Sequence, residues 1–345
     1  MNDPSAASAA LWDEAAVRAH NAKVTRRFME GLSREPKPAT TLPPPDVRVI
    51  RDMVFGRADS AAGEVELRMD LYLPAPSLAP TPVIVWLPGG GWRMQRRGVG
   101  PNLTRLFAQR GYAMADIDYR PSTVAVWPAQ LDDVTAALRH LRRIAPEYGL
   151  DADAIGLWGS SSGAHLAVLA GFAGARPDRA DAPAVRAVAA GYPSTDLLRV
   201  SEDALPGGIL GDLDPDDPSW GLLGGRPADL PDLARDASPV HQAGPGAPPV
   251  LLLHGDADLV IGPAQARRLF DALVTAGAEV HLLMVHGVDH GFLNAAAWEN
   301  PEAPHRATLH SSRDAMGTGE REVVLTPGLV ERFFDRHLRG DPWNG

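Results

Sequence analysis

With 345 residues, of which 45% are hydrophobic, the chain is long enough to bury a sizeable core in one large domain. The formal net charge is −10 and the basic residues form no long cluster, which excludes the electrostatic pattern of a nucleic-acid-binding protein. Because the sequence has no cysteine, it excludes disulfide bonds, thiol catalysis and cysteine-ligated metals.

The N-terminal part of the chain carries acidic and basic side chains throughout and contains no apolar run of signal-peptide length. No later stretch approaches the roughly eighteen uninterrupted apolar residues of a membrane-spanning helix. We therefore expect a cytoplasmic protein with no membrane partner and no nucleic-acid partner.

Residues 1–46 are predicted to form an amphipathic helix, whose apolar residues fall at helical spacing, followed by a proline-rich segment. Two stretches of alternating polar and apolar residues, 47–55 and 65–74, then predict a β-hairpin. The continuous apolar run at 82–88 is typical of a strand that is covered on both faces.

Beyond this run, predicted strands and helices alternate along the chain. The predicted strands cover residues 112–119, 154–159, 185–193, 249–255 and 279–285, and the predicted helices cover 103–111, 129–149, 164–173, 265–277 and 328–338. The alternation fails at about 197–247, a segment rich in Pro, Gly and Asp that we interpret as a lid-like insertion. This pattern predicts an α/β fold with a mostly parallel central sheet and helices on both faces. We expect residues 1–345 to form a single domain that carries this lid.

The stretch IGLWGSSSGAHLAV, residues 155–168, places three serines between an apolar strand and a helix of small residues. A strand, a sharp turn and a helix are the setting of a nucleophile elbow, whose motif is Gly-x-Ser-x-Gly. Only Ser161 has glycine two positions away on both sides, at Gly159 and Gly163. Glycine suits these positions because the turn strains the backbone and leaves little space for side chains. Ser161 is therefore the candidate nucleophile.

A serine nucleophile requires a general base and a third group that orients the base. Two later strand ends supply candidates for both roles, namely Asp256 and Asp258 after one strand and His286, Asp289 and His290 after the next. The carboxyl ends of parallel strands lie at one edge of a sheet, so these groups can meet the serine. The chain order Ser, Asp, His is the order found in α/β-hydrolases.

A glycine-rich loop, Gly89 to Gly91, directly follows the apolar strand at 82–88. Glycine allows backbone N–H groups to approach a substrate closely and to stabilise an oxyanion. The N–H of Ser162, the residue after the nucleophile, is the other expected donor. The predicted oxyanion hole therefore consists of Gly90, Gly91 and Ser162.

Several stretches together resemble one family, among them LPGGGW, EYGLDADAIGLWGSSSGAHLAVLAG, PPVLLLHGDADLVI and VHGVDHGF. They look like the α/β-hydrolase carboxylesterases of the hormone-sensitive-lipase and bacterial feruloyl-esterase-like group, over about residues 47–340. The resemblance implies the α/β-hydrolase fold, with Ser161 as nucleophile and His290 as base. It also implies that Asp258, rather than Asp256, is the acid.

The chain departs from this family at two places. The family usually reads His-Gly-Gly-Gly, whereas Pro88 stands here in place of the His. Proline fixes its own φ near −65°, and we expect this rigidity to hold the glycine loop without the missing histidine. The second departure is the long segment at 293–322, after the base, which the family usually lacks.

Bulky aromatic residues are predicted to line a short substrate site, and they are Trp92, Trp127, Trp220 and Phe292. We therefore expect a carboxylesterase that cleaves small-molecule esters of short-chain or aromatic acids through an acyl-enzyme intermediate. The expected chemistry needs no cofactor and no metal. The sequence leaves a homodimer open.

Other functions use the same residues differently. An amidase such as an arylformamidase, or a peptidase, would use the same triad. A metallohydrolase would take its ligands from His254, Asp256, Asp258, His286, Asp289 and His290, but would leave the Ser161 elbow unexplained. A non-catalytic binding protein of hydrolase-like fold is the third alternative, and the intact Ser, Asp and His argue against it.

Overall fold

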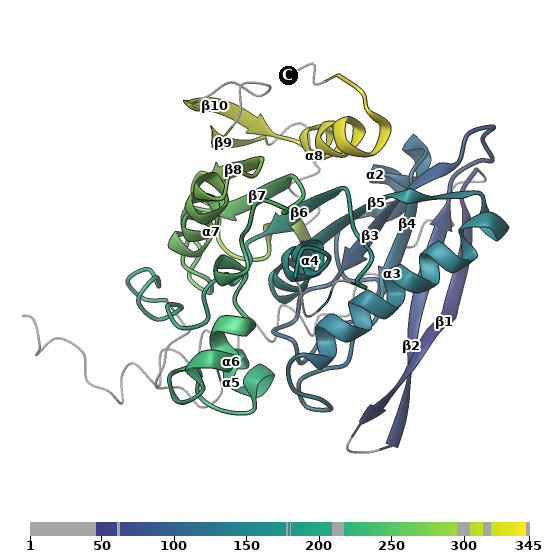
Figure 1. Ribbon diagram of the computed structural model, residues 1–345. Coiled ribbons are helices and arrows are strands. Elements are labelled where there is room, and N and C mark those ends of the chain that lie inside the picture. The colour runs from purple at the N-terminus through teal and green to yellow at the C-terminus, as the bar shows by residue number, and fades with distance from the viewer. Residues whose placement is uncertain are drawn as a thin grey trace, which may run out of the picture.

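The computed structural model describes residues 46–60, 63–176, 179, 181–208, 217–294, 304–312 and 319–342. Its strands are β1 (Arg48–Ser60), β2 (Gly63–Leu73), β3 (Thr81–Leu87), β4 (Ala113–Ile117), β5 (Leu150–Ser160), β6 (Ala187–Gly191), β7 (Val250–Gly255), β8 (Val280–Val285), β9 (His305–Ser311) and β10 (Gly319–Leu325). They form a ten-stranded sheet in the order β1-β2-β4-β3-β5-β6-β7-β8-β9-β10 (Figure 1).

The middle of this sheet is parallel and its two edges are antiparallel. Strand β3 pairs in parallel with β4 and β5, and parallel pairing continues through β6, β7 and β8. At one edge β1 and β2 form the hairpin that the alternating sequence predicts, and β2 pairs antiparallel with β4. The predicted mostly parallel sheet and the N-terminal hairpin are therefore confirmed.

The order of the strands reverses at β3, because β4 lies on one side of it and β5 on the other. Ligands of open α/β sheets bind at the carboxyl ends of the strands beside such a reversal. The last paired residues of β3 and β5 are Leu87 and Gly159. The glycine loop after β3 and the turn that carries Ser161 therefore begin side by side.

Helices cover both faces of the sheet, as Figure 1 shows. The helices are α2 (Leu103–Leu106), α3 (Ala129–Tyr148), α4 (Ser162–Ala173), α5 (Pro218–Leu223), α6 (Pro231–Asp236), α7 (Ala264–Thr275) and α8 (Pro327–Phe334), with shorter helical turns between them. Buried residues of α3, α4 and α7, such as Leu131, Leu166 and Leu269, belong to one apolar cluster. Buried residues of α2 and α8, such as Leu106 and Phe333, belong to a second. The central strands are apolar because each has a core on both sides.

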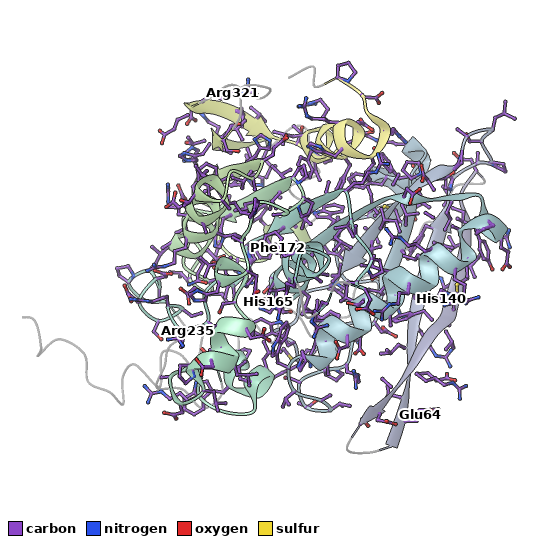
Figure 2. The ribbon with its side chains drawn as sticks, viewed as in Figure 1. Glu64, His140, His165, Phe172, Arg235 and Arg321 are labelled. Carbon is purple, nitrogen blue, oxygen red and sulfur yellow. The ribbon has the colours of Figure 1, made fainter. Side chains whose placement is uncertain are left out.

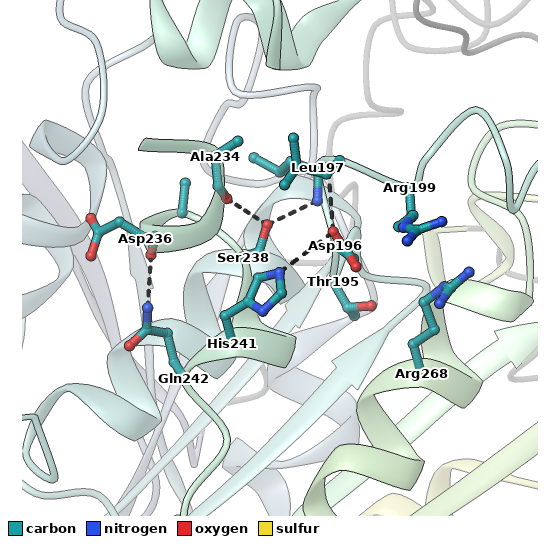
Figure 3. Close-up of polar contacts among 12 residues, drawn as sticks. Thr195, Asp196, Leu197, Arg199, Ala234, Asp236, Ser238, His241, Gln242 and Arg268 are labelled. Atoms are coloured by element: carbon teal, nitrogen blue, oxygen red, sulfur yellow. Dashed lines mark hydrogen bonds and ion pairs between the residues drawn. The ribbon is translucent and has the colours of Figure 1, made fainter. Parts of the chain in front are cut away.

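The predicted insertion at 197–247 contains α5 and α6 in its described part. Its two ends lie beside each other (Figure 3). The Leu197 N–H donates to the Ser238 hydroxyl at 2.9 Å, and that hydroxyl donates to the Ala234 carbonyl at 2.6 Å. His241 lies 3.8 Å from the Asp196 carboxylate. Hydrogen bonds therefore join the two ends of the insertion. Its action as a lid and the organisation of the chain as a single domain stay predictions.

The segment that follows the candidate base adds two strands that the sequence analysis does not predict. Strands β9 and β10 form an antiparallel hairpin, and β9 extends the sheet by pairing with β8. An edge hairpin is only partly buried, so β9 and β10 contain many polar residues and lack the apolar pattern from which a strand is predicted. The predicted N-terminal helix lies outside the described residues. Among the described residues, no helix combines the length and apolar character that crossing a bilayer requires.

Candidate active site

Ser161 occupies the sharp turn between β5 and α4, with φ 53° and ψ −123°. A non-glycine residue rarely adopts positive φ, so its surroundings must hold it in place. A Cβ atom on Gly159 would lie 2.6 Å from the Gly163 carbonyl carbon, and one on Gly163 would lie 2.1 Å from the Leu87 carbonyl oxygen. Only glycine at these two positions lets the strand, the turn and the helix approach this closely.

The structure brings Ser161, His290 and Asp258 into one chain of contacts. The Ser161 Oγ lies 2.9 Å from His290 Nε2. On the other side of the ring, His290 Nδ1 lies 2.8 Å from Asp258 Oδ2. A carboxylate can only accept, so Nδ1 carries the proton and Nε2 can accept the hydroxyl proton of the serine.

The Asp258 carboxylate is buried and has a full set of donors. Its Oδ1 accepts from the N–H groups of Val260 and Ile261, each at 2.8 Å. Its Oδ2 lies 3.3 Å from His254 Nε2, besides its contact with His290. Burial alone would raise the pKa of Asp258, but the charge of His290 and the hydrogen bonds of both histidines outweigh it and lower that pKa. Asp258 is therefore ionised and can orient the base.

The other two candidate carboxylates join the loops that carry the acid and the base. Asp256 Oδ1 accepts from the Gly287 N–H at 2.6 Å. Asp289 Oδ1 accepts from the N–H groups of Leu259 at 3.0 Å and His290 at 2.7 Å. Each loop thus supplies a carboxylate to the backbone of the other. Sequence reasoning finds Asp256 and Asp289 by position but not this role, because it depends on backbone donors.

The glycine loop runs beside the nucleophile. A Cβ atom on Gly89 would lie 3.2 Å from the Ser161 Cβ. Gly90 has φ 145° and Gly91 has φ 59°, conformations that favour glycine. Among the described residues, the N–H groups of Gly90, Gly91 and Ser162 have no hydrogen-bond acceptor. These three backbone donors, two on the glycine loop and one at the start of α4, are therefore the candidates for holding an oxyanion.

Pro88 is held by a residue that the sequence analysis missed. The Tyr119 hydroxyl donates to the Pro88 carbonyl at 2.7 Å and lies 3.3 Å from the Ser162 hydroxyl. Burial raises the pKa of Tyr119, so this phenol keeps its proton. A hydrogen bond, in addition to the rigidity expected of proline, therefore fixes the start of the glycine loop. Tyr119 follows the strand next to β3, which is the signal that could have identified it.

The aromatic residues predicted to line the substrate site are mostly buried. Trp92, Trp127 and Phe292 are 4%, 3% and 6% exposed, and Trp220 on α5 is half-buried. Phe292 packs edge-on against Tyr192, whose ring centroid lies 4.6 Å from that of His290. Tyr192, also missed from the sequence, therefore supports the base. Contact of the four predicted residues with a substrate stays a prediction.

The histidines and carboxylates considered as metal ligands contact one another or the backbone instead. In the described ranges, no three acidic or histidine residues are grouped as a metal ion would require. His254, for example, contacts the Ile261 carbonyl at 2.8 Å as well as Asp258.

A family model supports this reading of the chain, since the BD-FAE model matches residues 69–273. The chain belongs to the BD-FAE family. The match runs from β2 to α7 and includes Ser161 and Asp258, whereas His290 lies beyond it. Membership of the BD-FAE family confirms the resemblance to esterases of α/β-hydrolase fold.

Curated relatives of this BD-FAE family member include two proteins of Mycobacterium tuberculosis (strain ATCC 25618 / H37Rv). Esterase LipQ is 34% identical over 217 residues, 59% of this chain and 49% of its own. Esterase LipC is 33% identical over 229 residues, 62% of this chain and 53% of its own. The chain therefore spans about half the length of these relatives.

Solved structures show the same fold. A truncated carbohydrate esterase from gut microbiota has a TM-score of 0.61 at 25% identity, over 73% of this chain and 92% of that chain. An esterase of the planctomycete Thermogutta terrifontis with butyrate bound has a TM-score of 0.56 at 26% identity, over 72% and 86%. The α/β-hydrolase fold class predicted from the sequence is thereby confirmed.

Proposed function

We propose that this BD-FAE family member is a serine carboxylic-ester hydrolase. One observation carries the proposal: Ser161, His290 and Asp258 form a contact chain of 2.9 Å and 2.8 Å, and the glycine loop approaches Ser161 at Gly89. The esterases among its relatives and structural neighbours support the same reaction.

In the proposed reaction, Ser161 Oγ attacks the ester carbonyl carbon while His290 Nε2 takes the hydroxyl proton. The negative charge that develops on the carbonyl oxygen is stabilised by the N–H groups of the glycine loop and Ser162. Collapse breaks the carbon–oxygen bond to the alcohol, which leaves with the proton from His290. Water then attacks the acyl-enzyme, again losing a proton to His290, which returns this proton to Ser161 Oγ as the bond to the acyl group breaks and the acid leaves. Asp258 keeps its charge throughout and stabilises the imidazolium.

This assignment uses only side chains and backbone of the described chain, so it requires no cofactor. Cytoplasmic location and a homodimer stay predictions, which cell fractionation and analytical ultracentrifugation test.

We further propose that the substrates are esters of short-chain or aromatic acids. Bulky residues lie near the base, because the Tyr192 ring is 4.6 Å from the His290 ring and Phe292 packs against Tyr192. A long acyl chain would need an extended apolar tunnel, since each buried CH₂ contributes only about 0.8 kcal/mol. The Thermogutta terrifontis esterase that binds butyrate supports a short acyl group by analogy.

A panel of p-nitrophenyl esters of increasing chain length, together with aromatic acyl esters, tests this substrate class. We expect kcat/KM to be highest for short or aromatic acyl groups and to fall for chains beyond about ten carbons. A maximum at such long chains would contradict the substrate class. Anilides of the same acids separate the alternatives, because an amidase would cleave them at rates comparable with the esters.

A further inference from the structure

His165 is a buried histidine that the proposed reaction does not use. It is 0% exposed and lies one turn beyond Ser161 on α4, where its N–H donates to the Ser161 carbonyl at 3.0 Å. Figure 2 shows His165 on the side of α4 that faces α5 and α6. Its ring has two polar partners, Trp92 Nε1 at 3.2 Å from Nδ1 and the Ala237 carbonyl at 2.7 Å from Nε2.

These partners assign the tautomer of the ring. The Ala237 carbonyl can only accept, so Nε2 donates to it. The Trp92 indole N–H can only donate, so Nδ1 accepts from it. Burial lowers the pKa of His165 to about 4, although the Ala237 carbonyl opposes this shift. The ring is therefore neutral near pH 7, with one nitrogen serving each partner.

Trp92 connects this ring to the glycine loop, because it directly follows Gly91. Its φ is 56°, a conformation that L-residues rarely adopt and that must be held by contacts. Its carbonyl accepts from the Ser122 N–H at 2.6 Å, and its ring meets that of His165 edge-on at 5.0 Å. The bond to His165 Nδ1 is the polar contact that fixes the indole.

Ala237 connects the ring to the insertion, because it follows α6 directly. The neighbouring Asp236 carboxylate accepts from the Trp127 indole at 2.7 Å, and the Trp127 ring lies 6.1 Å from that of His165. His165 thus lies where the nucleophile helix, the glycine loop and the insertion meet.

We propose that His165 is a positioning residue that holds the oxyanion loop in place through the Trp92 indole and ties it to the insertion through Ala237. The inference rests on the proposed function, since it assumes that Gly90 and Gly91 stabilise an oxyanion. In this role the insertion supports the catalytic loop.

Two substitutions at this one position separate the two bonds of the ring. In His165→Asn the side-chain oxygen can replace Nδ1 as acceptor for Trp92, but the contact with Ala237 is lost. In His165→Gln the side-chain nitrogen can replace Nε2 as donor to Ala237, but the acceptor for Trp92 is lost. Trp92→Phe removes the indole N–H from the other side and keeps an aromatic ring.

We expect Trp92→Phe and His165→Gln to lower kcat for a short ester by about tenfold to a hundredfold while KM changes less than about twofold, because the loop acts on the transition state. His165→Asn, which keeps an acceptor for Trp92 but loses the bond to Ala237, should lower kcat less than His165→Gln does. The double variant Trp92→Phe/His165→Gln should be no slower than either single variant, since both remove the same bond. The Trp92 indole N–H resonance in NMR spectra should shift in His165→Gln and stay near its parent position in His165→Asn.

Equal kcat in His165→Asn and His165→Gln, or losses in Trp92→Phe and His165→Gln that multiply in the double variant, would overturn the positioning role. Thermal melts of each variant show whether a loss of kcat merely follows a loss of folded protein. If both histidine variants fail to fold, Trp92→Phe still tests the bond between Trp92 and His165. Ser161→Ala distinguishes the two proposals. If Ser161→Ala is inactive but Trp92→Phe matches the parent, the positioning role fails alone, whereas an active Ser161→Ala removes the proposed function itself.

Discussion

Two aspartates only two positions apart on one loop differ completely in their surroundings. Asp258 is 0% exposed and touches His290 at 2.8 Å. Asp256 is partly exposed, accepts from the Gly287 N–H at 2.6 Å and lies 3.3 Å from His286. Their chemistry is the same, so the difference in contacts decides which of them can stabilise the imidazolium of the base.

Asp258→Asn and Asp256→Asn make a matched pair, each replacing a carboxylate by an amide of equal size. We expect Asp258→Asn to lower kcat by on the order of ten-thousandfold, because the neutral side chain no longer stabilises protonated His290. Asp256→Asn should cost less than about tenfold, since its oxygen can still accept from Gly287. Steady-state ester kinetics of both variants check this, and a larger loss in Asp256→Asn would reverse the assignment.

At the level of elements, the turn between β5 and α4 depends on how closely it approaches β3. Gly163, in the first turn of α4, faces the carbonyls of Leu87 and Pro88. Gly174, at the other end of the same helix, has φ −65°, and a Cβ atom added to it would lie 3.4 Å from the nearest atom, the Ala182 carbonyl oxygen. The two ends of α4 therefore tolerate an added methyl group very differently.

Gly163→Ala should destabilise the fold by about 3 kcal/mol or more, because its Cβ would lie 2.1 Å from the Leu87 oxygen and the backbone would have to move. Gly174→Ala should stay within about 1 kcal/mol of the parent. Urea unfolding of both variants gives the two free energies. Similar free energies of unfolding for the two would show that the elbow is not packed as tightly as described.

Local signals predict most of these elements. A few consecutive residues are enough to predict the alternating strands β1 and β2, the apolar strands β3, β7 and β8, and the Gly-x-Ser-x-Gly turn. Strand ends then bring Ser161, Asp258 and His290 to one edge of the sheet. The hairpin β9–β10 escaped prediction because its edge strands are polar, and the contact of His165 with Ala237 joins residues 72 positions apart. Such contacts depend on the finished packing, which no single window contains.

At the scale of the whole molecule, the buried His165 and the half-buried His337 make the folded state sensitive to acid. Burial lowers the pKa of both His165 and His337 to about 4, while the Ala237 carbonyl and Glu279 respectively oppose the shift. In an unfolded chain a histidine has a pKa of about 6.5. Between these values the unfolded chain binds protons that the native state does not. The contribution of these histidines to the free energy of unfolding is therefore fully present above about pH 6.5 and is lost as the pH drops toward 4.

We expect the free energy of unfolding to fall between pH 7 and pH 4.5, and to fall about 2 kcal/mol less in His165→Gln than in the parent. The reason is that glutamine binds no proton in either state. Urea unfolding at the two pH values measures both differences. Identical pH dependence in parent and variant would show that His165 is not held neutral in the fold.

Covalent labelling tests most directly whether Ser161 is the nucleophile of an ester hydrolase. A fluorophosphonate is a suitable probe, because it reacts with an activated serine hydroxyl. Intact mass and peptide mapping after treatment with a fluorophosphonate should show one adduct, on Ser161, that forms as ester turnover disappears. Ser160→Ala should keep the adduct and most turnover, whereas Ser161→Ala should lose the adduct and on the order of a millionfold in kcat. A folded Ser161→Ala protein that still hydrolyses the ester at near the parent rate, or an adduct on another residue, would contradict the account.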